Sequence, residues 1–153
     1  MSAEVSATQT ERILSRAAAR AAEKRLPYRG AVTPEEAWAL VEAGAARILD
    51  VRTREEWALV GRIPGAIEIE WKRYGDWRLN PAFVDEVKNS FAPGDRILLM
   101  CRSAQRSHDA AAQLAAAGFA ESYNVLEGFE GDKDAAARRT VNGWKVRGLP
   151  WFQ

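Results

Sequence analysis

Residues 97–107 decide the fold, and they read Ile97-Leu98-Leu99-Met100-Cys101-Arg102-Ser103-Ala104-Gln105-Arg106-Ser107. Four consecutive apolar residues predict a short strand that is covered on both faces, as in a parallel sheet. The polar residues after Cys101 predict a tight loop, and an alanine-rich helix follows it as far as Gly118. In open parallel sheets, ligands bind beyond the carboxyl ends of the strands. This segment therefore presents Cys101 as the candidate reactive residue.

Short apolar segments and helical segments alternate on both sides of this stretch. Strands are expected at 48–51, 67–70, 97–100 and 122–125. Helices are expected from Pro34 towards Gly44, at 54–59, at 82–91, between the cysteine loop and Gly118, and around 133–139. Strands separated by helices need crossover connections, which favour a mostly parallel sheet. We expect an α/β fold with about five strands, within the usual range for a sheet, and with helices on both faces.

The composition excludes several classes of protein. The chain has 153 residues, and roughly 150 residues usually make one domain. A net charge of +1 gives no global attraction to nucleic acid or to acidic lipid. The longest stretch without a charged residue covers residues 110–120 and is too short to span a bilayer. A single cysteine excludes an internal disulfide, and one histidine with one cysteine provides too few ligands for a structural metal site. These observations predict a cytoplasmic protein without metal or cofactor.

The first 29 residues form a separate feature. The segment from Thr10 to Leu26 predicts a helix that ends before Pro27, and no apolar signal sequence precedes it. Basic residues recur at every fourth position on one face of this helix, at Arg12, Arg16, Arg20 and Lys24. The simplest interpretation is a solvated face on an accessory helix, and the alternative is a docking surface for a second copy or a partner protein. The main domain is expected to cover residues 30–153.

The residues after Cys101 suit a nucleophilic thiolate. A free thiol has a pKa of about 8.5 and reacts only when ionised. Ionisation would be favoured by the N-terminus of the following helix, by converging loop N–H groups, and by the guanidinium groups of Arg102 and Arg106. The alternative is a buried core thiol, as unpaired cysteines often are. Two arginines, two serines and a glutamine in six positions argue against a purely apolar environment.

From about Gly30 to Trp151 the chain resembles a single rhodanese domain. The resemblance is carried, in chain order, by Asp50-Val51-Arg52, Glu56, Gly61 to Ala66, Cys101 to Ser107, Leu126-Glu127-Gly128, Gly143-Trp144 and Gly148-Leu149-Pro150. It implies a rhodanese-like fold in which the loop from Cys101 through Arg102, Ser103, Ala104, Gln105, Arg106 and Ser107 binds a persulfide on the cysteine. Three positions depart from the family pattern: Arg62 stands where histidine is frequent, and Phe129 and Ala104 stand where glycine is frequent. If the loop needs a positive φ at residue 104, alanine costs about 1–2 kcal/mol there.

The resemblance implies a two-step sulfur transfer. The Cys101 thiolate would attack the outer sulfur of an anionic donor such as thiosulfate, and a thiol or cyanide would then accept the sulfur. Arg102 and Arg106 would attract the donor. Arg52 is a weaker candidate for the same pocket, and its alternative role is a salt bridge to Asp50 or Glu56.

Two other functions compete with sulfur transfer as interpretations of this loop. A phosphatase or arsenate reductase loop needs five residues between cysteine and arginine, whereas four separate Cys101 from Arg106. A persulfide carrier or binding module that serves a partner protein without turnover would have the same loop, and the sequence leaves that alternative open. His108 is expected to face solvent rather than act as a base. The tryptophans are expected to pack in the core, with one or two of the six at the pocket.

Overall fold

The computed structural model describes residues 3–153, with side chains from residue 8 onward. Its strands are β1 (Gly30–Val32), β2 (Arg47–Asp50), β3 (Ile67–Glu68), β4 (Ile97–Met100) and β5 (Ser122–Val125). Its helices are α1 (Ala3–Lys24), α2 (Pro34–Glu42), α3 (Arg54–Leu59), α4 (Phe83–Ser90) and α5 (Gln105–Ala116). All strand pairs of the five-stranded sheet are parallel, in the order β1-β5-β4-β2-β3. The predicted α/β class and parallel sheet are therefore confirmed.

The fifth strand, β1, was not predicted from the sequence as a strand. It has three residues and pairs at the sheet edge with β5, where Val32 lies opposite Val125. A segment this short shows no measurable alternation of apolar and polar residues. Strand β3 is also shorter than predicted, because only Ile67 and Glu68 pair with β2.

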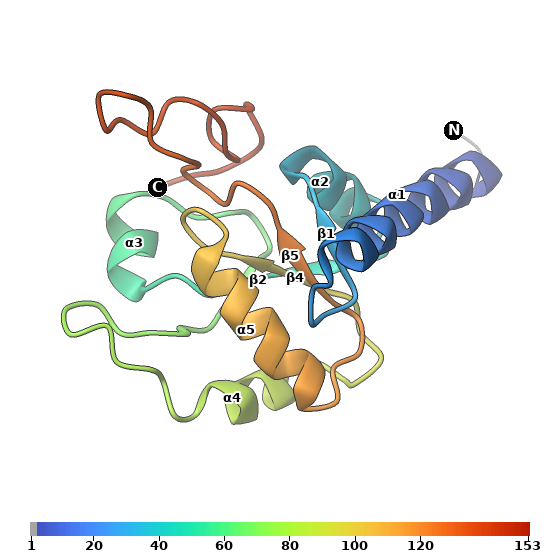
Figure 1. The fold of residues 1–153 in the computed structure, drawn as a ribbon, viewed down its shortest axis with the longest axis horizontal. Coiled ribbons are helices and arrows are strands. Elements are labelled where there is room, and N and C mark those ends of the chain that lie inside the picture. The colour runs from blue at the N-terminus through green and yellow to red at the C-terminus, as the bar shows by residue number, and fades with distance from the viewer. Residues whose placement is uncertain (1–2) are drawn as a thin grey trace.

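The two faces of the sheet carry separate parts of the core. Ile97, Leu99 and Cys101 lie in one apolar cluster with residues from α4 and α5, whereas Leu98 and Met100 lie in the other with residues from α1 and α2. This is the alternation expected of consecutive strand residues. Figure 1 shows α1 and α2 on one side of the sheet, and α4 and α5 on the other. The expectation of helices on both faces is confirmed.

Helix α1 packs closely against the domain. Ile13, Ala17 and Ala21 are buried, and a side chain at Gly30 on β1 would come within 2.8 Å of the Ala17 backbone. Because Gly30 has no side chain, the backbones of α1 and β1 can approach each other at this crossing.

The predicted basic stripe of α1 is not simply solvated, because Arg16 and Arg20 both form ion pairs with Glu36 on α2.

The helix predicted around 133–139 is absent from the structure, which has turns there instead. The Asp134 carboxylate accepts hydrogen bonds from the backbone N–H groups of Ala136 and Arg138, and from the Thr140 hydroxyl. Ala137 adopts a left-handed conformation with φ of 63°. A short polar side chain that bonds to nearby N–H groups competes with helix formation, and here it stabilises the turns.

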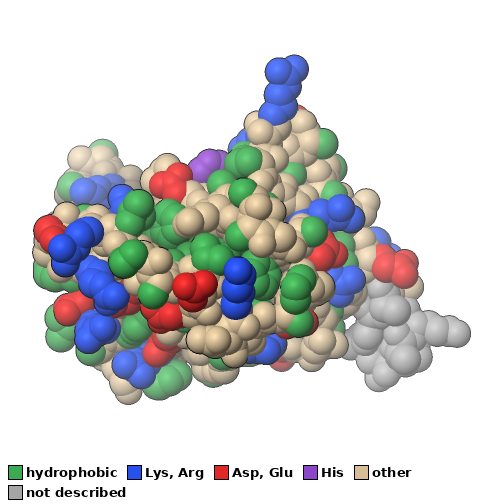
Figure 2. Space-filling model, turned by 90° about the horizontal axis from the view of Figure 1, so that it is seen from below, with side chains coloured by type: hydrophobic (Ala, Val, Ile, Leu, Met, Phe, Trp, Pro, Cys, Tyr) green, Lys and Arg blue, Asp and Glu red, His purple; other side chains and the backbone are tan. Residues whose placement is uncertain are grey.

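The surface carries charges of both signs. Figure 2 shows basic and acidic side chains intermixed with apolar ones over the face seen there, in keeping with a net charge of +1. Within residues 3–153, no helix combines the length and the apolar character needed to cross a membrane.

Candidate active site

Cys101 lies directly after β4, the central strand of the sheet, at its carboxyl end. The residue is only 1% exposed, yet it forms part of the wall of a pocket of about 240 Å³. The other lining residues are Lys72, Trp77, Arg102, Ser103, Gln105 and Arg106. The sulfur contacts the Ser107 hydroxyl oxygen at 3.3 Å. Cys101 thus continues the core of the α5 face and also faces a small polar opening.

The loop backbone is held from behind by the segment after β5. The N–H of Phe129 donates to the Cys101 carbonyl at 2.8 Å, and the N–H groups of Glu130 and Gly131 donate to the Arg102 carbonyl at 3.0 and 3.1 Å. Gly128 has φ of +74°, and a side chain there would lie 2.5 Å from the Arg102 carbonyl carbon. A glycine is needed at this position because the chain must pass the loop at backbone contact distance.

The loop and the first turn of α5 carry unpaired backbone amides within the described residues. Within the described residues, the N–H groups of residues 103–107 have no acceptor in the protein, and helix α5 begins at Gln105. Ala104 is the residue before this helix and has φ of 76°, so the conformation that favours glycine does occur there. Alanine is strained in this conformation by about 1–2 kcal/mol. Unpaired amides at a helix N-terminus favour a negative charge such as an ionised sulfur.

Arg106 is held by an acid from helix α3. Its guanidinium donates two hydrogen bonds to the Glu56 carboxylate, at 2.7 and 2.9 Å, and lies 5.2 Å from the centre of the Trp77 ring. Both partners are mostly buried, with 12% and 11% of the side chains exposed. Burial alone would raise the pKa of Glu56, but the hydrogen bonds and charge of Arg106 outweigh it, so that pKa is lowered. Burial likewise opposes the charge on Arg106, and Glu56 more than offsets it, so the pKa of Arg106 is raised.

Glu56 reaches this position because of a local sequence signal. Thr53 caps α3 by accepting the N–H of Glu56, and the Glu56 carboxylate accepts the N–H of Thr53 in return. This capping box fixes the first turn of the helix and directs the acid towards α5. The same carboxylate therefore caps α3 and orients Arg106.

The unpaired positive charge at the pocket comes from other residues. In the part of the chain with described side chains, neither Lys72 nor Arg102 forms an ion pair, whereas the charge of Arg106 is balanced by Glu56. Trp77 is 39% exposed, has φ of 55°, and makes an edge-to-face contact with Tyr74. Of the tryptophans, Trp77 is the one that lines the cysteine pocket, whereas Trp57, Trp71 and Trp144 are buried.

Arg52 lies outside this pocket. It is fully buried, donates to the Asp50 carboxylate at 2.7 Å and to the Gly61 carbonyl at 2.8 Å, and stacks over the Phe129 ring at 4.1 Å. The suggested pocket position of Arg52 is therefore replaced by its alternative, a salt bridge to Asp50. Phe129, where glycine is frequent in the family, supplies the ring that covers this guanidinium. Arg62 is paired with Glu68 at 3.6 Å.

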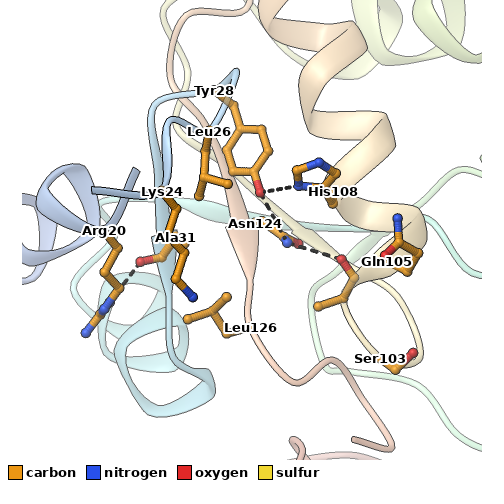
Figure 3. Close-up of a pocket in the computed structure, with 11 residues that line it drawn as sticks. Arg20, Lys24, Leu26, Tyr28, Ala31, Ser103, Gln105, His108, Asn124 and Leu126 are labelled. Carbon is orange, nitrogen blue, oxygen red and sulfur yellow. Dashed lines mark hydrogen bonds between the residues drawn. The ribbon is translucent and has the colours of Figure 1, made fainter. Parts of the chain in front are cut away.

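A second hollow of about 300 Å³ lies on the other side of the loop and shares Ser103 and Gln105 with the cysteine pocket. His108 and Tyr28 both line this hollow, and Figure 3 shows the hydrogen bond between them. The Tyr28 hydroxyl lies 2.7 Å from Nδ1 of His108. His108 is half-buried and lies away from the cysteine pocket, so it packs against Tyr28 rather than facing solvent.

Several residues at the site were missed by sequence reasoning. Lys72 and Trp77 reach the pocket from the irregular segment after β3, and Asn124 reaches the loop from β5. The Tyr28 side chain comes from the connection between α1 and β1. None of these positions carries a motif, because each depends on how distant segments meet.

The fold and the site together define a parallel α/β domain with its one cysteine at the carboxyl end of the central strand, in a pocket lined by cationic side chains. Residues 33–135 match the family of the rhodanese-like domain. The chain belongs to this family, which confirms the resemblance seen in the sequence.

Individual relatives agree with this assignment. The chain is 33% identical to "Thiosulfate sulfurtransferase 16, chloroplastic" of Arabidopsis thaliana, over 85% of this chain and 97% of that protein. It is 35% identical to "Uncharacterized protein RP600 homolog" of Rickettsia rickettsii, over 73% of this chain and 87% of that protein. The crystal structure of Rv0390 from M. tuberculosis superimposes with a TM-score of 0.73 at 36% identity, and the match covers 82% of this chain and 98% of that one. These similarities support a sulfurtransferase-type family of enzymes.

Proposed function

We propose that this protein is a sulfurtransferase that carries a sulfane sulfur as a persulfide on Cys101. The observation that carries the proposal is the position of Cys101, in a pocket with cationic side chains and beside loop amides that have no acceptor in the described protein. A reaction through a negatively charged sulfur needs such surroundings. The size of the pocket, about 240 Å³, suits a small donor.

The first half-reaction forms the persulfide. The Cys101 thiolate attacks the outer sulfur of an anionic donor such as thiosulfate, the bond between the two donor sulfurs breaks, and sulfite leaves with the electron pair. Lys72 and Arg102 attract the donor, since their charges are not balanced by an acid among the described side chains. Arg106 shapes the pocket wall from its fixed position against Glu56.

The second half-reaction returns the enzyme to its starting state. An acceptor thiolate or cyanide attacks the outer sulfur of the persulfide, that sulfur leaves as a new persulfide or thiocyanate, and Cys101 is again a thiolate. The loop amides stabilise the anionic sulfur in both half-reactions. The net reaction moves one neutral sulfur atom and needs neither an oxidant nor a metal.

Steady-state turnover tests this proposal against a carrier that does not turn over. Wild-type protein with thiosulfate and cyanide is expected to produce thiocyanate with double-displacement kinetics, and Cys101→Ser is expected to produce none. Ser107 and the loop backbone remain in that variant, so it serves as a matched control for binding alone. A single stoichiometric transfer without turnover would favour a persulfide carrier, and release of phosphate from an aryl phosphate at a comparable rate would contradict sulfur transfer.

A further inference from the structure

Two buried polar side chains lie directly behind the sulfur. Ser107 on α5 is fully buried and Asn124 on β5 is 4% exposed. The Ser107 hydroxyl contacts the Cys101 sulfur at 3.3 Å and the Asn124 side-chain oxygen at 2.5 Å. The sulfur, the hydroxyl and the amide thus form a continuous chain in the interior.

The orientation of the Asn124 amide is fixed by its second neighbour. Its Nδ2 lies 3.2 Å from the Ala104 carbonyl oxygen, which can only accept a hydrogen bond, so this end of the amide must be the donor. The same Nδ2 lies 3.5 Å from the Tyr28 hydroxyl, and Figure 3 shows Asn124 between Tyr28 and the loop. Oδ1 therefore faces Ser107 and can only accept.

This orientation decides the hydrogen bonds of the sulfur. Ser107 has one hydroxyl proton, and the hydroxyl donates it in a hydrogen bond to Asn124 Oδ1, at an O–O distance of 2.5 Å. The contact between Ser107 and Cys101 must then use the thiol proton, with S–H donating to Ser107 Oγ. The arrangement in the structure suits the neutral thiol, because an ionised sulfur would face the lone pairs of Ser107.

We propose that Asn124 is a positioning residue that controls how readily Cys101 ionises, because it competes with the sulfur for the single proton of Ser107. When Cys101 loses its proton to water in the pocket, the Ser107 hydroxyl turns from Asn124 Oδ1 to the sulfur. The buried Oδ1 then loses its donor, which opposes ionisation. Ser107 and Asn124 therefore act in opposite directions on the thiolate. The inference rests on the proposed function only in that Cys101 reacts as a thiolate.

Charged groups at and near the pocket act by a different route. Lys72, Arg102 and Arg106 line the pocket, Glu56 pairs with Arg106, and Asp50 and Arg52 form a buried pair outside it. Within the described side chains, none of them hydrogen-bonds to Ser107 or Asn124. His108 is separated from Asn124 by the Tyr28 hydroxyl. Changes at Ser107 and Asn124 thus alter the hydrogen bonds of the sulfur without removing any of these charges.

The amount of thiolate in the resting protein tests this inference. It is measured at neutral pH from the absorbance at 240 nm and from the rate of alkylation by iodoacetamide, with Cys101→Ser as the blank. Ser107→Ala removes the donor that stabilises the ionised sulfur, and the thiolate is expected to fall about tenfold. Asn124→Leu, of similar size, removes the competing acceptor, and the thiolate is expected to rise several-fold. Asn124→Asp keeps an acceptor and adds a negative charge, so the thiolate is expected to fall.

The opposite signs distinguish this inference from a merely structural role. Tyr28→Phe is the matched control, since it removes a hydroxyl next to Asn124 without changing the acceptor that faces Ser107. Circular dichroism of each variant verifies folding, and Asn124→Ala replaces Asn124→Leu if the latter does not fold. If Ser107→Ala and Asn124→Leu change the thiolate in the same direction, or leave it unchanged, the inference is wrong. The measurement uses no sulfur donor, so a failure of sulfur transfer in the wild type leaves this result interpretable, and the reverse also holds.

Discussion

The ion pair between Arg106 and Glu56 gives the most quantitative prediction for the site. Glu56→Gln keeps a side chain that can complete the capping box of α3, but it removes the charge that balances Arg106. With 12% and 11% of the two side chains exposed, the pair is buried, and loss of one partner from such a pair costs about 3 kcal/mol of folding free energy. We expect a similar loss for Arg106→Met, which keeps an apolar stem but removes the guanidinium that lies over the Trp77 ring.

A double-mutant cycle separates the pair from its surroundings. The doubly substituted protein leaves no uncompensated charge, so we expect it to be more stable than the sum of the single effects by about 2 kcal/mol. Urea unfolding followed by tryptophan fluorescence measures all four free energies of unfolding. If the two substitutions add to within about 0.5 kcal/mol, the additivity usual for independent sites, the guanidinium does not depend on Glu56 and the description of the pocket wall is wrong.

The pair also predicts a dependence on pH. The pKa of Glu56 is lowered in the folded protein. Its contribution to stability is therefore present above the ordinary glutamate pKa of about 4.3, and is lost as the pH falls through the lower folded value. In Glu56→Gln this part of the acid destabilisation is expected to be absent.

Three further predictions follow from particular contacts. Gly128→Ala is expected to displace the loop and reduce the rate of persulfide formation at least tenfold, because its new methyl group would meet the Arg102 backbone; an unchanged single-turnover rate would contradict the close packing. Ala104→Gly removes the strain of alanine in the left-handed conformation but increases the conformational entropy of the unfolded chain, so we expect it to stabilise the protein by about 0–1 kcal/mol in urea unfolding. A loss of more than about 1 kcal/mol, larger than the entropy cost of glycine, would show that residue 104 is not strained. Burial and the Glu121 carboxylate raise the pKa of Tyr123 to about 12. The contribution of Tyr123 to stability is therefore present below the ordinary tyrosine pKa of about 10, and is lost as the pH rises through the folded value. Tyr123→Phe is expected to lose less stability over that range, and equal losses in both proteins would refute the raised pKa.

The sequence was sufficient for those parts of the fold that depend on local patterns. The apolar run Ile97–Met100 and the helix that begins at Pro34 depend on signals within a few residues, and both elements occur where they were predicted. The strand Gly30–Val32 was missed because it depends on pairing with β5 and on the packing of α1. The helix expected at 133–139 was wrong, because the Asp134 side chain forms hydrogen bonds that stabilise turns there.

The site, like the fold, was predictable only where its residues are consecutive in the sequence. The loop from Cys101 to Ser107 lies in a continuous stretch of sequence, so its position at the end of β4 could be predicted from the strand before it. The partners of the loop come from distant segments: Glu56 from α3, Asn124 from β5 and Gly128 from the chain that follows. No local pattern shows that Arg106 is balanced by Glu56 while Lys72 and Arg102 are not. This distribution of charge depends on tertiary contacts and required the structure.

Intact mass spectrometry after incubation with thiosulfate tests the proposed persulfide most directly. We predict that the wild-type protein gains the mass of one sulfur atom, that cyanide or a reducing thiol removes it, and that Cys101→Ser gains nothing. A wild-type protein whose mass stays unchanged, or an equal gain in the Cys101→Ser variant, would contradict sulfur transfer through Cys101.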